Sequence, residues 1–229
     1  MNAKIIEIFN SIQGEGKYAG TRQVFVRFFE CNMHCVWCDT PHSIGDSTRN
    51  FRTMNTGEIM DEVDRVSPNA GAVSLTGGEP LLQADFIRLL LPLLRDRGLK
   101  IHLDTNGTLP DELEKIIDLV DVVAMDLKVP SSTRQRSFWK EHREFLNVAL
   151  KSEVFIKTVI SSQVDLGDIR LARDIVAEAD PDILFVLQPN SFDLGNGVMK
   201  SCHAAEVLCR ERLNHVRVLP QMHKMLKVR

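Results

Sequence analysis

Short runs of β-branched and aromatic residues alternate with longer helical patterns along nearly all 229 residues of this chain. The short runs predict eight strands, at residues 5–9, 24–29, 72–75, 100–104, 122–126, 154–160, 183–187 and 216–219. Apolar spacings such as Ile87, Leu90 and Leu94 predict six helices, at residues 54–66, 84–96, 110–119, 134–149, 166–179 and 200–213. This alternation indicates parallel strands joined by crossover helices.

The number of strand–helix units limits which parallel fold the chain can form. About six units are too few for a complete barrel of eight. We therefore predict a partial, TIM-like α/β barrel, with an open doubly wound sheet as the alternative. No internal repeat, low-complexity segment or linker rich in Pro, Gly and Ser divides the sequence. We expect residues 1–229 to form a single domain.

Several predicted strands carry charged or polar residues, although a parallel sheet is normally covered and apolar on both faces. These residues are Arg27, His102, Asp104, Asp126, Lys128 and Lys157. Any one of them could equally lie in solvent at a fraying strand end. Their recurrence on four strands instead favours a polar lumen that receives a charged ligand.

The composition is that of an ordinary globular protein, with 44% hydrophobic residues, 26% charged residues and a formal net charge of −3. The mixed charges argue against a basic face that binds nucleic acid. The longest apolar stretches, such as residues 89–94, fall far short of the roughly 20 residues that a membrane span needs. Residues 1–13 do not resemble a signal peptide. We therefore expect a cytoplasmic protein, in which thiols stay reduced.

Three of the five cysteines, Cys31, Cys35 and Cys38, form a C-x3-C-x2-C pattern directly after a predicted strand. They therefore lie on a loop at the strand's C-terminal end, where barrel enzymes build their active sites. Three thiolates can hold three irons of a four-iron, four-sulfur cluster and leave the fourth iron open, whereas electron-transfer clusters use four cysteines. Zinc bound by these cysteines and His34 or His42 is an alternative, but zinc ligands usually form two separated pairs.

The other two cysteines lie on a predicted helix and not on a loop. Cys202 and Cys209 are seven residues apart on a predicted helix, so they share a face. Free cysteines are commonly buried. We expect both to be core residues.

The cysteine pattern, with an aromatic residue just before the last cysteine, resembles the radical S-adenosylmethionine (SAM) superfamily. Thr76-Gly77-Gly78-Glu79-Pro80 resembles its Gly-Gly-Glu motif, in which glycines let the backbone approach a ligand closely. Residues 7–16, 24–27, 38–40, 187–189 and 221–224 are similar to the 7-carboxy-7-deazaguanine synthase family. The chain departs from that family at Asp126-Leu127-Lys128, where the family often has Ser-Pro-Lys.

This resemblance implies a reaction in which 6-carboxy-5,6,7,8-tetrahydropterin becomes 7-carboxy-7-deazaguanine with loss of ammonia. Such a carbon–nitrogen lyase step leads to 7-deazapurine nucleosides of tRNA, queuosine or archaeosine. The implied cofactors are a [4Fe-4S] cluster, SAM and Mg²⁺. The implied partners are the free pterin, an electron donor of the flavodoxin or ferredoxin type, and a second copy in a homodimer.

Two other functions compete with this reading. A radical SAM activase would make a glycyl radical on a protein partner, and residues 104–107 and 125–128 resemble such activases. A non-catalytic zinc or iron–sulfur binding module is a second alternative. It would leave the Gly-Gly-Glu motif and the charged strands unexplained.

The resemblance also implies roles for individual residues, with none assigned as a general acid or base. The cluster ligands would be Cys31, Cys35 and Cys38. SAM would be contacted by Trp37, Cys38, Asp39, Gly78, Glu79, Asn106, Asp126, Leu127 and Lys128. The substrate would be contacted by Ile12, Gln13, Gly14, Arg27 and Thr76, and Mg²⁺ by Thr40. Residues at the pocket edge would be Gln188, His223 and Lys224.

Alternatives remain open for some of these residues. The guanidinium of Arg27 matches a carboxylate bidentately, but Arg27 could instead form an internal ion pair with Glu30 or Glu15. Trp37 could pack within the cysteine loop. Thr40 could be a helix-capping or turn residue. His223 and Lys224 could belong to an ordinary surface tail.

Overall fold

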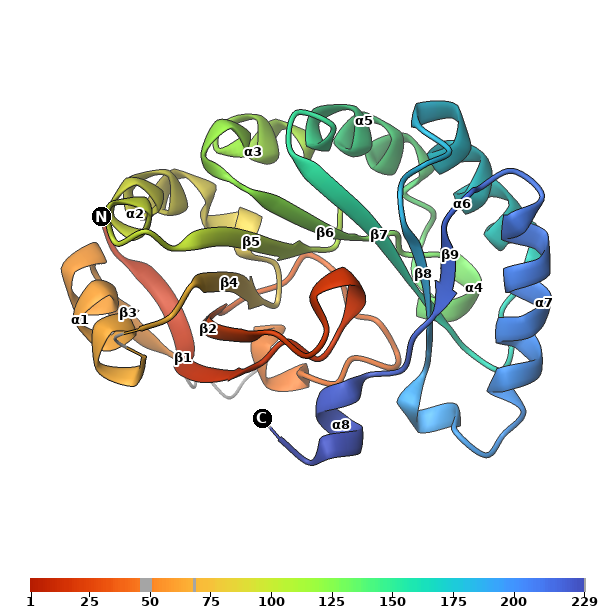
Figure 1. Ribbon diagram of the computed structural model, residues 1–229, viewed down its shortest axis with the longest axis horizontal. Coiled ribbons are helices and arrows are strands. Elements are labelled where there is room, and N and C mark those ends of the chain that lie inside the picture. Colours follow the sequence, from red (N-terminus) through yellow and green to blue (C-terminus); the bar gives the residue numbers. More distant parts are fainter. Residues whose placement is uncertain (46–50, 68, 229) are drawn as a thin grey trace.

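Nine strands form one open sheet in the computed structural model, which describes residues 1–45, 51–67 and 69–228 (Figure 1). The strands are β1 (Ala3–Ile12), β2 (Arg22–Phe28), β3 (Arg52–Met54), β4 (Ala72–Gly77), β5 (Lys100–Thr105), β6 (Val122–Asp126), β7 (Glu153–Ile160), β8 (Phe185–Pro189) and β9 (Val216–Val218). The α-helices are α1 (Thr56–Val66), α2 (Ala84–Asp96), α3 (Pro110–Glu114), α4 (Pro130–Thr133), α5 (Trp139–Ala149), α6 (Leu166–Ala179), α7 (Val198–Arg210) and α8 (Met222–Leu226). Short 3-10 turns are η1 (Gly16–Tyr18), η2 (Pro41–Ser43), η3 (Pro80–Gln83), η4 (Ile117–Leu119) and η5 (Ser191–Asp193).

The strand order shows how the sheet is wound. It runs β3-β1-β2-β4-β5-β6-β7-β8-β9, so the strands from β4 to β9 follow their order along the chain. Each neighbouring pair from β2 to β9 is parallel. The crossover helices α1, α2, α3, α5, α6 and α7 lie along the outer side of the curved sheet (Figure 1). Because a doubly wound sheet would reverse its strand order partway, the fold is the predicted partial barrel of six βα units.

The first strand departs from the parallel arrangement that the sequence predicts. β1 pairs antiparallel with β2, which places Glu7 opposite Arg27, and it pairs antiparallel with β3 on its other side. The sequence does not predict β3, because three residues are too few to show an alternating pattern. The predicted helix start at residue 54 is also wrong, since a capping box formed by Asn55 and Glu58 starts α1 at Thr56.

The predicted helix 134–149 is wrong in its first turn. α4 ends at Thr133, and Arg134 follows in the left-handed conformation with φ 59°. The next residue, Gln135, donates from Nε2 to the backbone oxygen of His34 at 2.9 Å. This segment therefore holds the cysteine loop, and α5 begins only at Trp139. The predicted helix 110–119 likewise divides into α3 and η4.

The main hydrophobic core lies between the sheet and the outer helices. The buried face of α2, Phe86, Ile87, Leu90, Leu91 and Leu94, repeats at helical spacing. As predicted, Cys202 and Cys209 lie in this core and are fully buried. Among the described residues, no helix is both long and apolar enough to cross a membrane.

A second, smaller apolar cluster lies on the other face of the sheet. It consists of Val122, Ala124, Phe155 and Val186, with Tyr18 of η1 packed against it. His102 is buried beside this cluster and meets the rings of Tyr18 and Phe155 edge-on. The inner face is therefore apolar at one end, and its charged residues gather at the C-terminal ends of the strands.

Candidate active site

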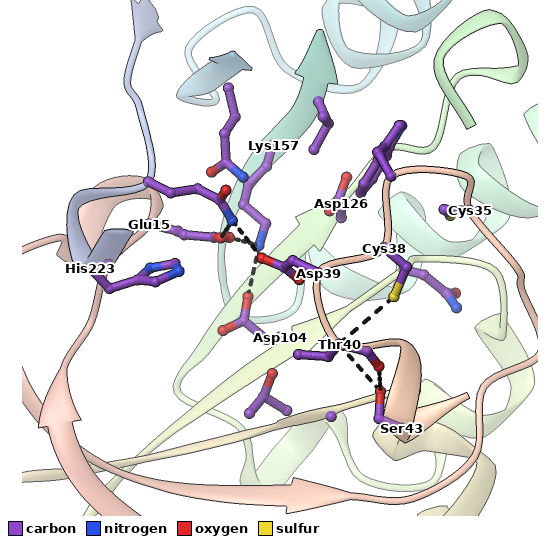
Figure 2. Close-up of a pocket in the computed structure, with 18 of the residues that line it drawn as sticks. Glu15, Cys35, Cys38, Asp39, Thr40, Ser43, Asp104, Asp126, Lys157 and His223 are labelled. Carbon is purple, nitrogen blue, oxygen red and sulfur yellow. Dashed lines mark hydrogen bonds and ion pairs between the residues drawn. The ribbon is translucent and has the colours of Figure 1, made fainter. Parts of the chain in front are cut away.

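A cavity of about 420 Å³ opens at the C-terminal ends of the parallel strands (Figure 2). Arg27, Asp104, Asp126, Lys128 and Lys157 line it, as predicted for a polar lumen. The prediction is wrong for His102, which is buried against the rings of Tyr18 and Phe155 instead. Apart from Glu79 and Leu127, every residue to which the family resemblance assigns a role lines this one cavity. These residues are Ile12, Gln13, Gly14, Arg27, Cys31, Cys35, Trp37, Cys38, Asp39, Thr40, Thr76, Gly78, Asn106, Asp126, Lys128, Gln188, His223 and Lys224.

Two glycines let the loop after β4 pack against the end of β2. A Cβ atom on Gly77 would lie 2.2 Å from the backbone oxygen of Phe28, and one on Gly78 would lie 2.1 Å from that of Glu30. The two backbones are joined by hydrogen bonds from Gly78 N to Phe28 O (3.2 Å) and from Glu79 N to Glu30 O (2.8 Å). The Gly-Gly-Glu loop therefore sets the path of the chain as it enters the cysteine loop.

The three loop cysteines face the same cavity as free thiols. Burial raises the pKa of Cys31 to about 11 and also raises that of Cys35. Within the described part of the chain, these thiols do not form a group whose ligand atoms all lie within 4.8 Å of one another. His34 and His42 are exposed and do not line the cavity. The donor set therefore fits a multi-iron cluster better than a single zinc ion.

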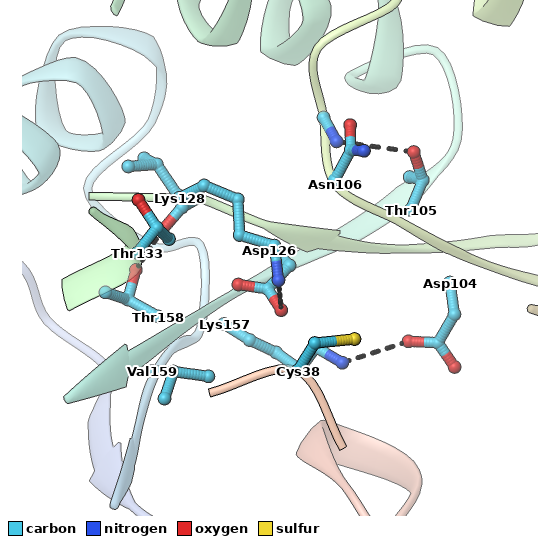
Figure 3. A network of polar contacts seen from close by, with 12 residues as sticks. Cys38, Asp104, Thr105, Asn106, Asp126, Lys128, Thr133, Lys157, Thr158 and Val159 are labelled. Atoms are coloured by element: carbon cyan, nitrogen blue, oxygen red, sulfur yellow. Dashed lines mark hydrogen bonds and ion pairs between the residues drawn. The ribbon is translucent and has the colours of Figure 1, made fainter. Parts of the chain in front are cut away.

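An ion pair between Lys128 and Asp126 lies over the ring of Trp37, beside the cysteine loop. The Lys128 ammonium lies 4.6 Å from the centre of the Trp37 ring and 2.7 Å from Oδ2 of Asp126. Burial disfavours the charge on Lys128, but Asp126 raises its pKa well above the usual value. The other carboxylate oxygen, Asp126 Oδ1, is buried without a hydrogen-bond partner among the described residues. It is an acceptor available to a ligand in the cavity (Figure 3).

Of the residues that the sequence predicts to contact SAM, Glu79 and Leu127 do not line the cavity. Glu79 is fully buried and accepts hydrogen bonds from Leu81 N, Thr105 Oγ1 and Asn106 N at 3.0, 2.9 and 2.7 Å. Burial raises its pKa to about 7, although these donors oppose the shift. Glu79 therefore fastens the loop after β4 to the end of β5.

Leu127 is buried because it lies on the opposite face of the chain from its two charged neighbours. Its side chain is in the core, and its backbone N–H donates to Lys157 O at 2.8 Å. Its backbone oxygen accepts from Thr158 Oγ1 at 3.1 Å. Leu127 thus anchors the segment that presents Asp126 and Lys128.

Arg27 reaches the cavity from β2 and forms an ion pair, but with neither partner that the sequence suggests. Its Nε lies 2.8 Å from Oε1 of Glu7, the residue opposite it on β1. Glu30 instead pairs with Lys4 at 2.7 Å, and Glu15 pairs with Lys157. A guanidinium carries five N–H donors, so a contact through Nε leaves donors for a ligand carboxylate.

A buried charge network that the sequence predicts only in part crosses the middle of the cavity. Lys157 Nζ lies 2.6 Å from Oε2 of Glu15 and 3.1 Å from Oδ1 of Asp104 (Figures 2 and 3). Burial would raise the pKa of Glu15, but Lys157 and Gln221 lower it to about 2. The same carboxylates raise the pKa of Lys157 well above its usual value, against the effect of burial. The sequence signal is a lysine that interrupts an apolar strand.

The C-terminal segment closes one side of the cavity. Gln221 Nε2 donates to Glu15 Oε1 at 2.7 Å and to Asp39 Oδ2 at 2.9 Å, and Lys224 pairs with Asp39 at 3.0 Å. A Cβ atom on Gly14 would lie 2.0 Å from the ring of His223, so this approach requires a glycine. The sequence does not predict α8, because five residues show no helical period.

Two sets of side chains could hold a metal ion. Ligand atoms of Glu15, Asp39 and His223 lie within 4.8 Å of one another. Lysines already neutralise both of those carboxylates. Thr40 Oγ1 lies 3.8 Å from the sulfur of Cys38 and accepts a hydrogen bond from Ser43 Oγ at 3.2 Å. These hydroxyls are hard donors of the kind that Mg²⁺ takes together with ligand oxygens and water.

Comparisons with known proteins show what this chain is similar to. Residues 26–161 match the model of the radical SAM superfamily. The chain is 35% identical to a 7-carboxy-7-deazaguanine synthase of Geobacter sulfurreducens, over 98% of this chain and 97% of that protein. It is 36% identical to one of Archaeoglobus fulgidus over the full length of both. A crystal structure of QueE from Escherichia coli covers 97% of this chain and 95% of its own, with a TM-score of 0.67 and 23% identity. That structure shares the fold.

Proposed function

Because this chain belongs to the radical SAM superfamily and, within it, to the 7-carboxy-7-deazaguanine synthases, we propose that it converts 6-carboxy-5,6,7,8-tetrahydropterin to 7-carboxy-7-deazaguanine with loss of ammonia. The observation that carries this proposal is the meeting of three thiols, the Gly-Gly-Glu loop and Arg27 around one cavity. The reaction is a carbon–nitrogen lyase step in 7-deazapurine biosynthesis. The activase alternative is not favoured, because relatives that match the chain over nearly its full length carry the synthase name.

The cofactors divide the cavity into two sides. A [4Fe-4S] cluster held by Cys31, Cys35 and Cys38, with SAM, supplies one-electron chemistry that removes a hydrogen atom from the substrate. On the SAM side we place Trp37, Asp39, Gly78, Asn106, Asp126 and Lys128. Glu79 and Leu127 do not line this side, but their hydrogen bonds hold the loops that form it.

The substrate side lies between β1, β2 and the C-terminal segment. Arg27 binds the pterin carboxylate through the guanidinium donors that Glu7 does not occupy. Ile12, Gln13, Gly14 and Thr76 border the pterin ring. Ion pairs with Glu15 and Asp104 fix the Lys157 ammonium in one position on this side of the cavity.

Three further assignments belong to the same proposal. Thr40 is the protein's Mg²⁺ ligand, with substrate oxygens completing the site. The electron comes from a partner of the flavodoxin or ferredoxin type, because the reaction needs a one-electron reductant. The chain acts in the cytoplasm as a homodimer.

The test is anaerobic incubation of the iron-loaded protein with SAM, a chemical reductant and the carboxytetrahydropterin. We expect 7-carboxy-7-deazaguanine to appear by absorbance and mass. Alanine at Cys31, Cys35 or Cys38 should abolish SAM cleavage, whereas Cys202→Ala, a buried cysteine away from the cavity, should retain it. Equal loss in all four variants, or SAM cleavage without the deazaguanine, would contradict the proposal.

A further inference from the structure

His142 on α5 is fully buried outside the cavity, yet it contacts the backbone of two loops that line the cavity. Its Nδ1 lies 2.9 Å from the backbone oxygen of Gly107, in the loop after β5. Its Nε2 lies 3.1 Å from the backbone nitrogen of Lys128, in the loop after β6. One side chain therefore spans two neighbouring walls of the site.

The two partners fix the protonation state of the ring. A backbone N–H can only donate, so Nε2 must accept from Lys128. A backbone oxygen can only accept, so Nδ1 must carry the hydrogen that is donated to Gly107. Burial lowers the pKa of His142 to about 4, although Asp126 raises it. The charged groups that interact with it electrostatically include Asp126, Lys128 and Glu141.

Each loop that His142 contacts presents polar groups to the cavity. Gly107 follows Asn106, whose backbone N–H is held by Glu79 and whose side chain donates to Asn32 at 2.7 Å. Lys128 carries the ammonium that lies over Trp37. The fit at Gly107 is tight, because a Cβ atom there would lie 3.2 Å from His142 Nδ1 and 2.9 Å from Met125.

We propose that His142 is a positioning residue for SAM. It sets the separation between the loop that carries Asn106 and the loop that carries Asp126 and Lys128, through one donated and one accepted hydrogen bond. A protonated ring could make only the donated bond to Gly107. This inference rests on the proposed function, because it takes those walls as the SAM side of the cavity. A helix on the outside of the barrel thus fixes the geometry of a ligand site on the inside.

The first test measures SAM affinity calorimetrically on iron-loaded protein, without turnover. We expect His142→Leu to weaken SAM binding about tenfold, as is typical when a supporting hydrogen-bond partner is lost. His142→Asn can restore the donor toward Gly107, and His142→Gln can restore the acceptor toward Lys128. Both should bind SAM better than His142→Leu. If His142→Leu binds SAM as the wild type does, the proposal is overturned.

The matched control separates positioning from folding. Leu146, one turn along α5, is fully buried in the core and contacts neither loop backbone in any hydrogen bond. Leu146→Ala should lower the unfolding temperature while the SAM affinity of the folded protein stays unchanged. Comparable weakening of SAM binding in Leu146→Ala and His142→Leu would show that α5 matters only for stability. His203→Gln, at an exposed histidine on α7, should change neither quantity.

A spectroscopic measurement tests the hydrogen bonds directly. The ring ¹⁵N shifts of His142 should report a neutral ring with its hydrogen on Nδ1, and this state should persist below the ordinary histidine pKa. A ring with its hydrogen on Nε2 would contradict the geometry. Wild-type protein that binds SAM but makes no 7-carboxy-7-deazaguanine would overturn the proposed function and leave the role of His142 standing.

Discussion

Arg27 enters the cavity with one nitrogen already engaged by Glu7 and its guanidinium 5.6 Å from the centre of the Phe9 ring. The stacked pair of Phe9 and Phe25, with ring centres 5.1 Å apart, supports this position. A side chain held on two sides presents its remaining donors in a fixed direction, which suits a planar carboxylate. A lysine has no such fork, so the identity of the cation matters as well as its charge.

We predict that Arg27→Lys raises the KM for the pterin steeply and leaves SAM affinity unchanged. The lost charge-assisted contact should cost about 1.5–3 kcal/mol. Steady-state kinetics together with SAM calorimetry would measure both quantities. The matched control is Arg88→Lys, at an exposed arginine on α2. Normal turnover of Arg27→Lys would mean that Arg27 only pairs with Glu7.

The hydroxyl of Thr40 is a weak metal ligand by itself, so Mg²⁺ needs substrate oxygens to bind there. We predict that Mg²⁺ stimulates turnover and tightens pterin binding, with little effect on SAM affinity when substrate is absent. Thr40→Val keeps the shape and removes the oxygen, so it should abolish the stimulation. If Asp39→Asn abolishes it and Thr40→Val does not, the ion is held instead by the group of Glu15, Asp39 and His223.

His142 should also make stability depend on pH. Its pKa is about 4 in the fold, below the ordinary histidine value of 6.5, so the folded state binds fewer protons than the unfolded state between these values. Its contribution is therefore complete above pH 6.5 and is lost as the pH falls toward 4, on the order of 3 kcal/mol in all. Denaturant unfolding across this range should show a steeper decline for the wild type than for His142→Gln. Parallel curves would show that His142 does not titrate as described.

At the scale of elements, two loops and a strand end are locked together by close backbone contact. The loop after β4 can pass the end of β2 only because Gly78 has no side chain. Glu30, on the other side of that contact, has φ 80°, a strained value for a residue with a Cβ. The entry to the cysteine loop is thus fixed by backbone geometry before any cofactor binds.

We predict that Gly78→Ala lowers both the iron content after anaerobic reconstitution and the unfolding temperature. The new methyl group would lie 2.1 Å from Glu30 O and 2.7 Å from Ser43 O, so the cysteine loop must shift. Gly71→Ala is the matched control, because a Cβ there meets nothing within 4 Å. Full iron content in Gly78→Ala would show that the loop adapts without loss of the cluster site.

Elements with a clear period could be predicted from the sequence to the residue. The bounds of α2 and α6 agree with the apolar spacing, and β6 agrees with its β-branched run. The break between α4 and α5 could not be predicted, because it depends on Gln135 reaching the backbone of His34. β3 exists only through its pairing with β1. Local patterns carry no information about such partners.

The residues of the candidate site also fall into those that could be predicted from the sequence and those that could not. Residues within motifs, such as the cysteines and Gly78, could be assigned because a motif implies their surroundings. The network of Lys157, Glu15 and Asp104 could not, because its members are up to 142 positions apart. Glu79 and Leu127 also belong to motifs but are fully buried and do not line the cavity, because a motif does not say which of its side chains are buried.

At the scale of the whole molecule, the C-terminal segment meets the loop after β1 over the cavity. Met222 N donates to Gly14 O at 2.8 Å, which joins the first residue of α8 to the loop after β1 (Figure 1). Gln221 then links that loop to the cysteine loop through the carboxylates of Glu15 and Asp39. The open side of the partial barrel is therefore covered by its own C-terminal segment, on the side where we place the pterin.

We predict that Gln221→Leu raises the KM for the pterin, lowers the unfolding temperature and leaves SAM affinity unchanged. Two carboxylates would lose a shared donor while they remain partly buried, which should cost about 1–3 kcal/mol. Gln163→Leu, at an exposed glutamine outside this cavity, is the matched control for the change in side chain. Because Gln221 contacts Asp39 beside the cysteine loop, the variant also tests whether the two sides of the cavity act separately. A loss of SAM affinity equal to the loss of pterin affinity would show that the C-terminal segment supports the whole site and not the pterin side alone.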